Sequence, residues 1–461
     1  MRRIPFTLST LLVFLALIGF SASTLQALEK QPTAVYHGRR VALGDKLKGG
    51  VAILFAAEES ELDFSSYRQD PDFYYLTGWN QPGAALLVIG PAAERQTPMG
   101  KLPGHEYREI LFLPTRNLRA ERYSGEKMDA ATPNATTLAG VDEVKPLSEL
   151  PGLLNKLAAE DPTIFRGLAT EPESKQSETL LEWTAVTFGQ HKAPQTKDLS
   201  KLIAELRLIK DAGEVELLKK AESTSILGQR AMFKAVHPGA TELAVAGAMT
   251  KVWMENGCQR PAYFPIVGSG PNSTTLHYSE NSRTMQDGEV VVVDAACEYS
   301  MYASDITRTV PVNGHFTDRQ REIYNVVYGA QKAAIDAFVA GKSKLLDWSH
   351  TDPDALDTAA YNYINTHGKG PHGEPLGKYW MHGLGHMVGI DVHDVYSQIE
   401  YPAVLKPGMV FTIEPGVYIP EENIGVRLEC VFLVGEDGKL IDLTADLPHT
   451  AEEIEAAMKA K

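Results

Sequence analysis

The sequence predicts an α+β protein in which an N-terminal α/β domain precedes a second domain with an internal duplication. Apolar runs of strand length alternate with polar turns over residues 35–190, whereas apolar residues recur at helical spacing from residue 199 onward. Further along, two apolar strands each end in a carboxylate, and the two acids, Asp294 and Glu414, lie 120 positions apart. With 461 residues, the chain is long enough for two or three domains.

The first residues of the chain, 1–27, predict a cleaved secretory signal. Arg2 and Arg3 precede an apolar run over residues 8–20, and small and polar residues follow it. The run is shorter than the ~20 residues that cross a bilayer core, so we expect no stable membrane anchor. Pro5 stands where a twin-arginine signal would have an apolar residue, which favours the ordinary secretory route. The sequence therefore predicts a secreted or periplasmic protein.

The composition limits both the partners and the cross-links of the chain. Lys and Arg number 44 against 59 Asp and Glu, a net charge of −15, and the loss of two arginines with the signal would make it −17. This acidic balance argues against nucleic acid as a partner. Cys258, Cys297 and Cys430 are too few for a disulfide framework, so at most one bridge is expected.

The first domain is expected to contain strands at residues 50–55, 84–89 and 109–113. Between the last two, residues 90–106 are rich in Pro and Gly and are expected to form a surface loop. The alternation of short apolar runs with polar turns is typical of a sheet whose strands are partly or wholly buried. These features predict a compact N-terminal domain built around one sheet.

The boundary between the two domains is predicted near residue 198. A polar, Pro-containing stretch precedes it, and residues 199–220 then follow the pattern of a charged amphipathic helix. Another long helix is expected at residues 318–339. The chain thus divides into a signal (1–27), an N-terminal domain (28–197) and a second domain (198–461).

Two strands that end in a carboxylate repeat one pattern in the second domain. A glycine stands six positions before each of Asp294 and Glu414, and a second acid follows each copy, Asp305 in the first and Glu429 in the second. A carboxylate at the end of an apolar strand costs several kcal/mol unless a cation or hydrogen-bond donors receive it. The four acids are therefore predicted to meet around a pseudo-twofold axis. The alternative is local, with Asp294 capping a turn and Asp305 paired with Arg308.

Three histidines, His382, His386 and His393, lie within twelve residues among several glycines. A single histidine would more often be an ordinary core or surface residue, but three together indicate a site. The pattern differs from the helical His-Glu-x-x-His zinc motif because no Glu follows the first histidine.

Four carboxylates and the imidazole of His386 form an oxygen-rich ligand set, which favours Mn²⁺ or another six-coordinate divalent ion. Two divalent ions carry the positive charge that four carboxylates can balance. Such a pair of ions activates a bridging water and polarises a substrate carbonyl, so an amide can be hydrolysed without a serine or cysteine nucleophile. No Gly-x-Ser-x-Gly nucleophile motif is present in the sequence.

Four segments resemble the motifs of the pita-bread metallopeptidases, specifically the proline-directed branch that contains aminopeptidase P and prolidase. The segments are residues 294–310, 382–394, 412–418 and 425–429. The resemblance implies a pseudo-twofold pita-bread catalytic domain with two divalent metal ions. It also implies that the substrates are peptides with proline at the second position, cut between the N-terminal residue and the proline.

The resemblance further implies a role for each ligand. Asp305 and Glu429 would bridge the two ions, and Asp294 would be a bidentate ligand of one of them. His386 and Glu414 would complete the other, with Glu414 also carrying a proton during catalysis.

Four residues outside the ligand set also match the family. His277 resembles the catalytic histidine that stabilises the transition state. His382 and His393 resemble histidines that line the substrate site, and His393 also counts as catalytic. Arg427 resembles an arginine that lies behind the ligands and orients them.

Segments outside the metal-ligand motifs favour one member of this branch over another. Residues 66–82 and 121–125 resemble the N-terminal domain of aminopeptidase P, and residues 447–458 resemble its C-terminal tail, which favours an Xaa-Pro aminopeptidase over prolidase, an Xaa-Pro dipeptidase. A creatinase-like hydrolase would not need five metal ligands, and a metal-free scaffold on the same fold would normally have lost them. The sequence leaves the bound ion and the oligomeric state open, a homo-oligomer included.

Cys430 departs from the family pattern, in which an acid or another polar residue follows the position of Glu429. Neighbours on a strand point to opposite faces, so Cys430 is expected to face away from the metal ions and to pack in the core. Cys297 lies three positions after Asp294, and the same reasoning predicts that it too is a packing residue.

Overall fold

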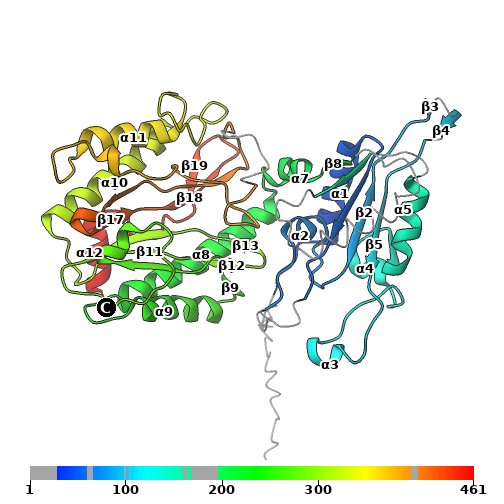
Figure 1. Cartoon of the computed structure of the whole chain (residues 1–461), viewed down its shortest axis with the longest axis horizontal. Coiled ribbons are helices and arrows are strands. Elements are labelled where there is room, and N and C mark those ends of the chain that lie inside the picture. The colour runs from blue at the N-terminus through cyan, green and yellow to red at the C-terminus, as the bar shows by residue number, and fades with distance from the viewer. Residues whose placement is uncertain are drawn as a thin grey trace, which may run out of the picture.

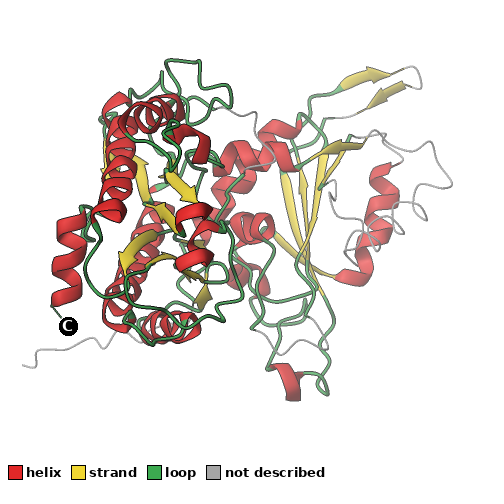
Figure 2. Cartoon of the chain, turned by 60° about the vertical axis from the view of Figure 1, so that its left-hand side comes forward, coloured by secondary structure: helices red, strands yellow, loops and turns green. Residues whose placement is uncertain are grey.

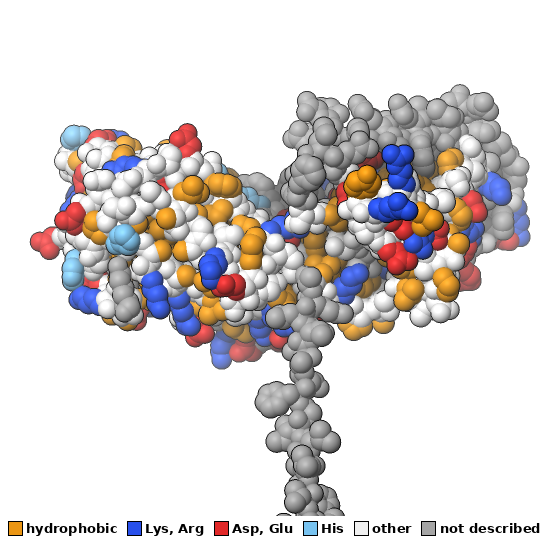
Figure 3. Space-filling view, turned by 90° about the horizontal axis from the view of Figure 1, so that it is seen from below, with side chains coloured by type: hydrophobic (Ala, Val, Ile, Leu, Met, Phe, Trp, Pro, Cys, Tyr) orange, Lys and Arg blue, Asp and Glu red, His pale blue; other side chains and the backbone are white. Residues whose placement is uncertain are grey.

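The computed structural model describes residues 28–59, 66–97, 100–102, 104–158, 163–167, 196–395 and 403–460. It has two lobes, an N-terminal one and a larger C-terminal one, which lie side by side in Figure 1. Acidic and basic side chains are interspersed on the face of both lobes that Figure 3 shows. Residues 1–27, predicted to be a signal, lie outside the described residues. Among the described helices, none has the length and apolarity needed to span a bilayer.

A six-stranded sheet with the order β6-β5-β2-β1-β7-β8 forms the N-terminal lobe. Its strands are β1 (Val51–Phe55), β2 (Ala85–Ile89), β5 (Arg108–Leu113), β6 (Glu143–Pro146), β7 (Ile164–Arg166) and β8 (Thr196–Asp198). Antiparallel pairing joins β1 to β2 and β2 to β5, and the outer pairs are parallel. The three strands predicted from the sequence are confirmed to within one residue at each end.

Helices cover this sheet on both faces, as Figure 2 shows. The helices of this lobe are α1 (Thr33–Leu47), α2 (Pro71–Thr77), α3 (Glu121–Ser124), α4 (Ala135–Ala139) and α5 (Leu150–Ala158), and the short α3 lies away from the sheet in Figure 1. Alternate residues of β1 and β2 pack against α1 and α2 on one side and against α5 on the other, which explains why these strands are almost uniformly apolar. The loop predicted at residues 90–106 is wrong in part, because it contains the hairpin of β3 (Arg95–Thr97) and β4 (Gly100–Leu102).

The single helix predicted at residues 199–220 is in fact two helices, α7 (Ser200–Arg207) and α8 (Ala212–Ala235). The helix is interrupted before Asp211, which is the N-cap residue of α8. The Asp211 side chain accepts a hydrogen bond from the Glu214 backbone amide, and the Glu214 carboxylate accepts one from the Asp211 backbone amide. This reciprocal capping box starts a new helix in the middle of a helical pattern. The last strand of the N-terminal sheet, β8, ends at Asp198.

The C-terminal lobe repeats one unit of two helices and a small sheet. The sheet β10-β11-β14 belongs to the first copy, β15-β18-β19 to the second, with β16-β17 beside them and β13-β12-β9 at the lobe's edge. In Figure 1 the pair α8 and α9 lies below the strands and the pair α10 and α11 above them. The strands are β9 (Arg260–Pro261), β10 (Ile266–Ser269), β11 (Val290–Asp294), β12 (Cys297–Tyr299), β13 (Tyr302–Ala303), β14 (Thr307–Pro311), β15 (Val410–Ile413), β16 (Gly416–Ile419), β17 (Ile424–Arg427), β18 (Cys430–Val434) and β19 (Leu440–Asp442). The helices are α9 (Glu242–Glu255), α10 (Asp318–Ala337), α11 (Leu356–His367) and α12 (Ala451–Lys459), and the long helix predicted at 318–339 is confirmed as α10.

Two buried glutamines mark the repeat in atomic detail. On α8, the Gln229 side-chain amide donates to the carbonyls of Ala295 and Ile306, at 3.0 and 3.1 Å. On α10, the Gln331 amide donates to the carbonyls of Ile413 and Leu428, again at 3.0 and 3.1 Å. Each glutamine therefore ties together the two backbone segments that carry one pair of the predicted acids. The duplication inferred from the carboxylate-ended strands is present in the fold.

The prediction that Cys297 only packs in the core is wrong, because its sulfur forms a disulfide with Cys258. The odd-spacing argument assumed one strand through Asp294 and Cys297, but β11 ends at Asp294 and β12 begins at Cys297. β12 pairs with β9, which starts two residues after Cys258, and this pairing brings the two sulfurs together. Cys430 is a buried free thiol, as predicted.

Candidate metal centre

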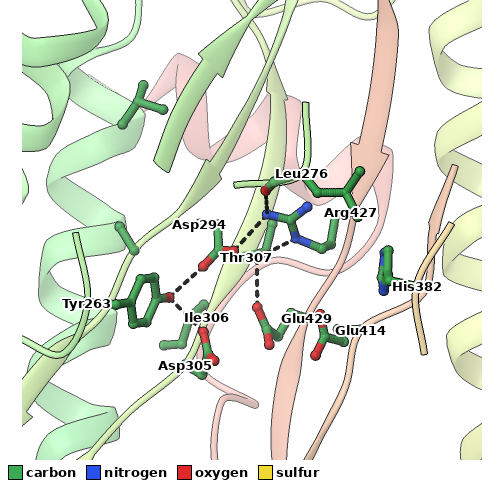
Figure 4. Close-up of polar contacts among 12 residues, drawn as sticks. Tyr263, Leu276, Asp294, Asp305, Ile306, Thr307, His382, Glu414, Arg427 and Glu429 are labelled. Carbon is green, nitrogen blue, oxygen red and sulfur yellow. Dashed lines mark hydrogen bonds and ion pairs between the residues drawn. The ribbon is translucent and has the colours of Figure 1, made fainter. Parts of the chain in front are cut away.

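The five predicted ligands meet in one cavity of about 380 Å³ in the C-terminal lobe. Asp294 ends β11, Asp305 precedes β14, and Glu414 and Glu429 occupy the corresponding places after β15 and before β18. His386 comes from the segment between α11 and β15. All five side chains are largely withdrawn from solvent, and Figure 4 shows the four acids pointing toward one another.

Three overlapping groups of ligand atoms can be drawn in this cavity, each with its atoms within 4.8 Å of one another. The groups are Asp294, Asp305 and Glu429; His386, Glu414 and Glu429; and Asp305, His386 and His393. Glu429, Asp305 and His386 each belong to two of the three groups, so any two groups have one residue in common. Shared carboxylates, here those of Glu429 and Asp305, fit a pair of adjacent ions with bridging ligands.

Hydrogen bonds orient three of the four acids, Asp294, Asp305 and Glu429. Arg427 donates through Nη2 to Asp294 Oδ2 at 2.7 Å, and Tyr263 donates its hydroxyl proton toward Asp294 Oδ1 at 2.5 Å and Asp305 Oδ1 at 2.6 Å. Thr307 Oγ1 donates to Glu429 Oε2 at 2.7 Å. These contacts, drawn in Figure 4, fix both oxygens of Asp294 and one oxygen each of Asp305 and Glu429, and so orient the three carboxylates.

His386 and Glu414, which lie before and after β15, form the other half of the cluster. His386 Nε2 lies 3.3 Å from Asp305 Oδ2 and 3.4 Å from Glu414 Oε1, while its Nδ1 lies 3.1 Å from the Met387 carbonyl. A backbone carbonyl at Nδ1 leaves Nε2 as the ligand atom. Thr412 Oγ1 donates to Glu414 Oε1 at 3.0 Å.

The charges of this cluster do not balance without cations. Burial, together with neighbouring acids, raises the pKa of Glu414 to about 7 and raises the pKa of Asp294 and of Glu429. One guanidinium, that of Arg427, opposes four clustered carboxylates. The oxygen-rich donor set and the uncompensated negative charge both fit divalent cations. The local alternative fails for Asp305, because Arg308 donates instead to the carbonyls of Thr307, Glu429 and Pro448.

The predicted catalytic histidine, His277, and the two predicted substrate-site histidines, His382 and His393, line the same cavity. His277 comes from the turn after β10 and is exposed at the cavity surface. His382 Nε2 lies 2.8 Å from the Tyr418 hydroxyl, which in turn accepts a hydrogen bond from Arg427 at 2.8 Å. The rings of His393 and His386 have centroids 4.0 Å apart.

A buried ion cluster fixes the turn that carries His393. Arg207, at the end of α7, forms ion pairs with Asp72 at 2.7 Å, with Asp391 at 2.7 Å and with Asp394. Lys210 Nζ lies 2.9 Å from the second oxygen of Asp394. Asp72 belongs to α2 in the N-terminal lobe, so this cluster joins the lobe to the rim of the cavity. Asp391 and Asp394, which lie before and after His393 in the sequence, are therefore both held in ion pairs.

Sequence reasoning missed four residues of this centre, Tyr263, Thr307, Thr412 and Tyr418. Tyr263 lies 31 residues before Asp294 in the loop between β9 and β10, where an aromatic residue carries no distinctive signal. Thr307 and Tyr418 lie inside the quoted motif segments, next to charged ligands and their partners. Their hydroxyl groups, two residues beyond Asp305 and four beyond Glu414, were the available clue.

Comparison with known proteins agrees with this geometry. The profile of metallopeptidase family M24 matches residues 216–436, and that of the aminopeptidase P N-terminal domain matches residues 36–165. Xaa-Pro aminopeptidase from Haemophilus influenzae is 32% identical, with 94% of this chain and 99% of that protein covered. The Escherichia coli Xaa-Pro aminopeptidase is 35% identical, with 92% and 97% covered.

The fold agrees as well. The solved structure of proline aminopeptidase P II from Yersinia pestis superposes with a TM-score of 0.80 at 30% identity, covering 94% of this chain and 100% of that one. A coverage of this extent includes both lobes. The chain therefore belongs to metallopeptidase family M24, within its aminopeptidase P group.

Proposed function

We propose that the protein is a metal-dependent Xaa-Pro aminopeptidase, which hydrolyses the bond between an N-terminal residue and a following proline. The observation that carries this proposal is the convergence of five ligand side chains and three histidines in one cavity. Relatives similar over nearly the whole chain bear the name of this activity. The N-terminal domain of the aminopeptidase P type favours an aminopeptidase over the dipeptidase alternative.

Asp294, Asp305, His386, Glu414 and Glu429 would hold two divalent ions, and the oxygen-rich set favours Mn²⁺. When bound, the ions would polarise the scissile carbonyl and make water a better nucleophile near neutral pH. Arg427 and Tyr263 keep Asp294 in place for this purpose.

The remaining residues would act on the substrate and on protons. Glu414 would accept a proton from the attacking water and pass it toward the leaving proline nitrogen. His277 would donate a hydrogen bond to the negative charge that develops on the substrate oxygen. His382 and His393 would contact the bound peptide from the cavity wall, with His393 close enough to His386 to reach the reacting bond.

The activity is tested with peptides and added metal. After chelation and dialysis, the protein should cleave Arg-Pro-Pro only when a divalent ion is restored, with Mn²⁺ giving the highest rate, and should cleave the dipeptide Gly-Pro poorly. Release of the free N-terminal amino acid, followed by chromatography, is the measurement. Preferred cleavage of Gly-Pro would identify a dipeptidase instead, and full activity in the chelated protein would refute the metal requirement.

The role of His277 is tested by substitution. His277→Ala should keep two ions per chain and an unchanged melting temperature, while kcat falls about 10²- to 10³-fold because one hydrogen-bond donor to the transition state is lost. Metal analysis, thermal unfolding and steady-state rates measure the three properties. His237→Ala, an exposed histidine outside the cavity, is the control and should leave the rate unchanged. A His277→Ala enzyme as fast as the parent would reduce His277 to a structural residue.

Export is proposed from the signal at residues 1–27, and the Cys258–Cys297 disulfide supports it because such bonds persist in oxidising compartments. The native protein should begin near residue 28 and, when unfolded without reductant, should show one reactive thiol, that of Cys430. Removing the bridge by Cys297→Ser should lower the free energy of unfolding by roughly 2–4 kcal/mol. N-terminal sequencing and thiol titration measure these properties, and an intact Met1 or three free thiols would contradict export.

A further inference from the structure

The lining of the catalytic cavity includes apolar side chains, one of them an exposed tryptophan. Leu276, Leu346, Trp348 and Met381 line the cavity together with the acids and the histidines. Trp348 is 67% exposed and Met381 63% exposed. Among the large hydrophobic side chains that are exposed in the described part of the chain, these two are the ones that line this cavity. A tryptophan with this exposure among the described residues, at the rim of a binding cavity, offers a large contact area to a ligand.

The loop that carries Trp348 is held firmly. Asp347 accepts hydrogen bonds from the backbone amides of Ser349, Thr351 and Asp352, and its own amide donates to both oxygens of Asp357, each at 2.8 Å. These contacts tie the loop to α11. A side chain presented by an already ordered loop loses little conformational freedom when a ligand binds it.

Neighbouring residues seat the indole against the histidine segment. Leu346, two positions before Trp348 in the chain, is buried in the core of the lobe. A side chain at Gly383 would place its Cβ 3.4 Å from Trp348 Cη2 and 2.9 Å from Leu346 Cδ2. The absence of a side chain there lets the ring lie close to Gly383, which follows His382 in the chain, and Trp348 lines the cavity together with both residues.

Three acids of the cavity are buried whereas Trp348 is exposed, and this difference indicates which part of a bound peptide reaches the tryptophan. Asp294, Asp305 and Glu429 are 8%, 4% and 1% exposed, so the scissile bond would lie at the bottom of the cavity. An aminopeptidase substrate ends one residue before that bond, and the part of the chain that leaves the cavity starts with the proline. The residue after the proline is therefore the first one positioned to reach an exposed side chain at the rim.

We propose that Trp348 is a specificity-determining residue that binds the side chain of the third residue of the peptide and favours an apolar or aromatic side chain there. This inference rests on the proposed aminopeptidase function. Because Trp348 contacts neither the ligands nor the scissile bond, its contribution is equal in the bound substrate and in the transition state. Such uniform binding lowers KM and leaves kcat unchanged.

The kinetic experiment compares Ala-Pro-Phe with Ala-Pro-Gly in the metal-loaded enzyme. The parent protein should show the lower KM for Ala-Pro-Phe. Trp348→Ala should raise the KM for Ala-Pro-Phe about tenfold, with little change in kcat and little change in either constant for Ala-Pro-Gly. Trp348→Phe should keep most of the preference, because a ring remains at the rim.

A control separates this effect from a general loss of exposed apolar surface. Met254 on α9 is 55% exposed and lies outside the cavity lining, so Met254→Ala should leave both KM values unchanged. Equal preference for the two peptides in the parent protein, or a preference that survives in Trp348→Ala, overturns the assignment.

A binding measurement decides the inference even without turnover. Titration with the dipeptide Pro-Phe should change the tryptophan fluorescence of the parent protein, and the change should be absent in Trp348→Phe. If the parent protein binds Pro-Phe with this change but does not hydrolyse Xaa-Pro bonds, the proposed function fails while the contact stands. If hydrolysis occurs but neither the fluorescence change nor the peptide preference depends on Trp348, the contact alone is refuted.

Discussion

The mutual repulsion of four buried carboxylates is the constraint on which the rest of this structure depends. Asp294, Asp305, Glu414 and Glu429 meet in one cavity, and burial raises the pKa of three of them. One arginine, one tyrosine and two threonines orient the oxygens but supply only one positive charge. Divalent cations fit this donor set and would balance its negative charge, which links the fold to the metallopeptidase family to which the chain belongs.

The duplicated architecture is what makes this crowding possible. Gln229 and Gln331 each bind two backbone carbonyls that adjoin a pair of acids, so each copy delivers two carboxylates from a rigid scaffold. The sites are built on strand ends rather than on long loops, which keeps ligand geometry within narrow limits. The N-terminal lobe contributes through Asp72, which pairs with Arg207. Because Arg207 also pairs with Asp391 and Asp394, these contacts link the N-terminal lobe to the turn that carries His393.

Much of this could be predicted from the sequence, because the information was local. An apolar strand that ends in Asp294 or Glu414 carries its own pattern, and glycine-flanked histidines are distinctive within a short segment. Two features could not be predicted, because each depends on residues brought together by the fold. Tyr263 approaches the acids from a distant loop, and Cys258 meets Cys297 through the pairing of β9 with β12. The capping box that divides the helix predicted at residues 199–220 is local, and the spacing of Asp211 and Glu214 was a signal for it in the sequence.

The central claim is that the five converging side chains hold two divalent ions. Crystals of the protein equilibrated with Mn²⁺ and measured at the manganese absorption edge test it directly. We expect two anomalous peaks ~3.5–4 Å apart, one beside Asp294 and the other beside His386 and Glu414, with Asp305 and Glu429 contacting both. A single peak, or peaks that lie away from these five residues, would contradict the account.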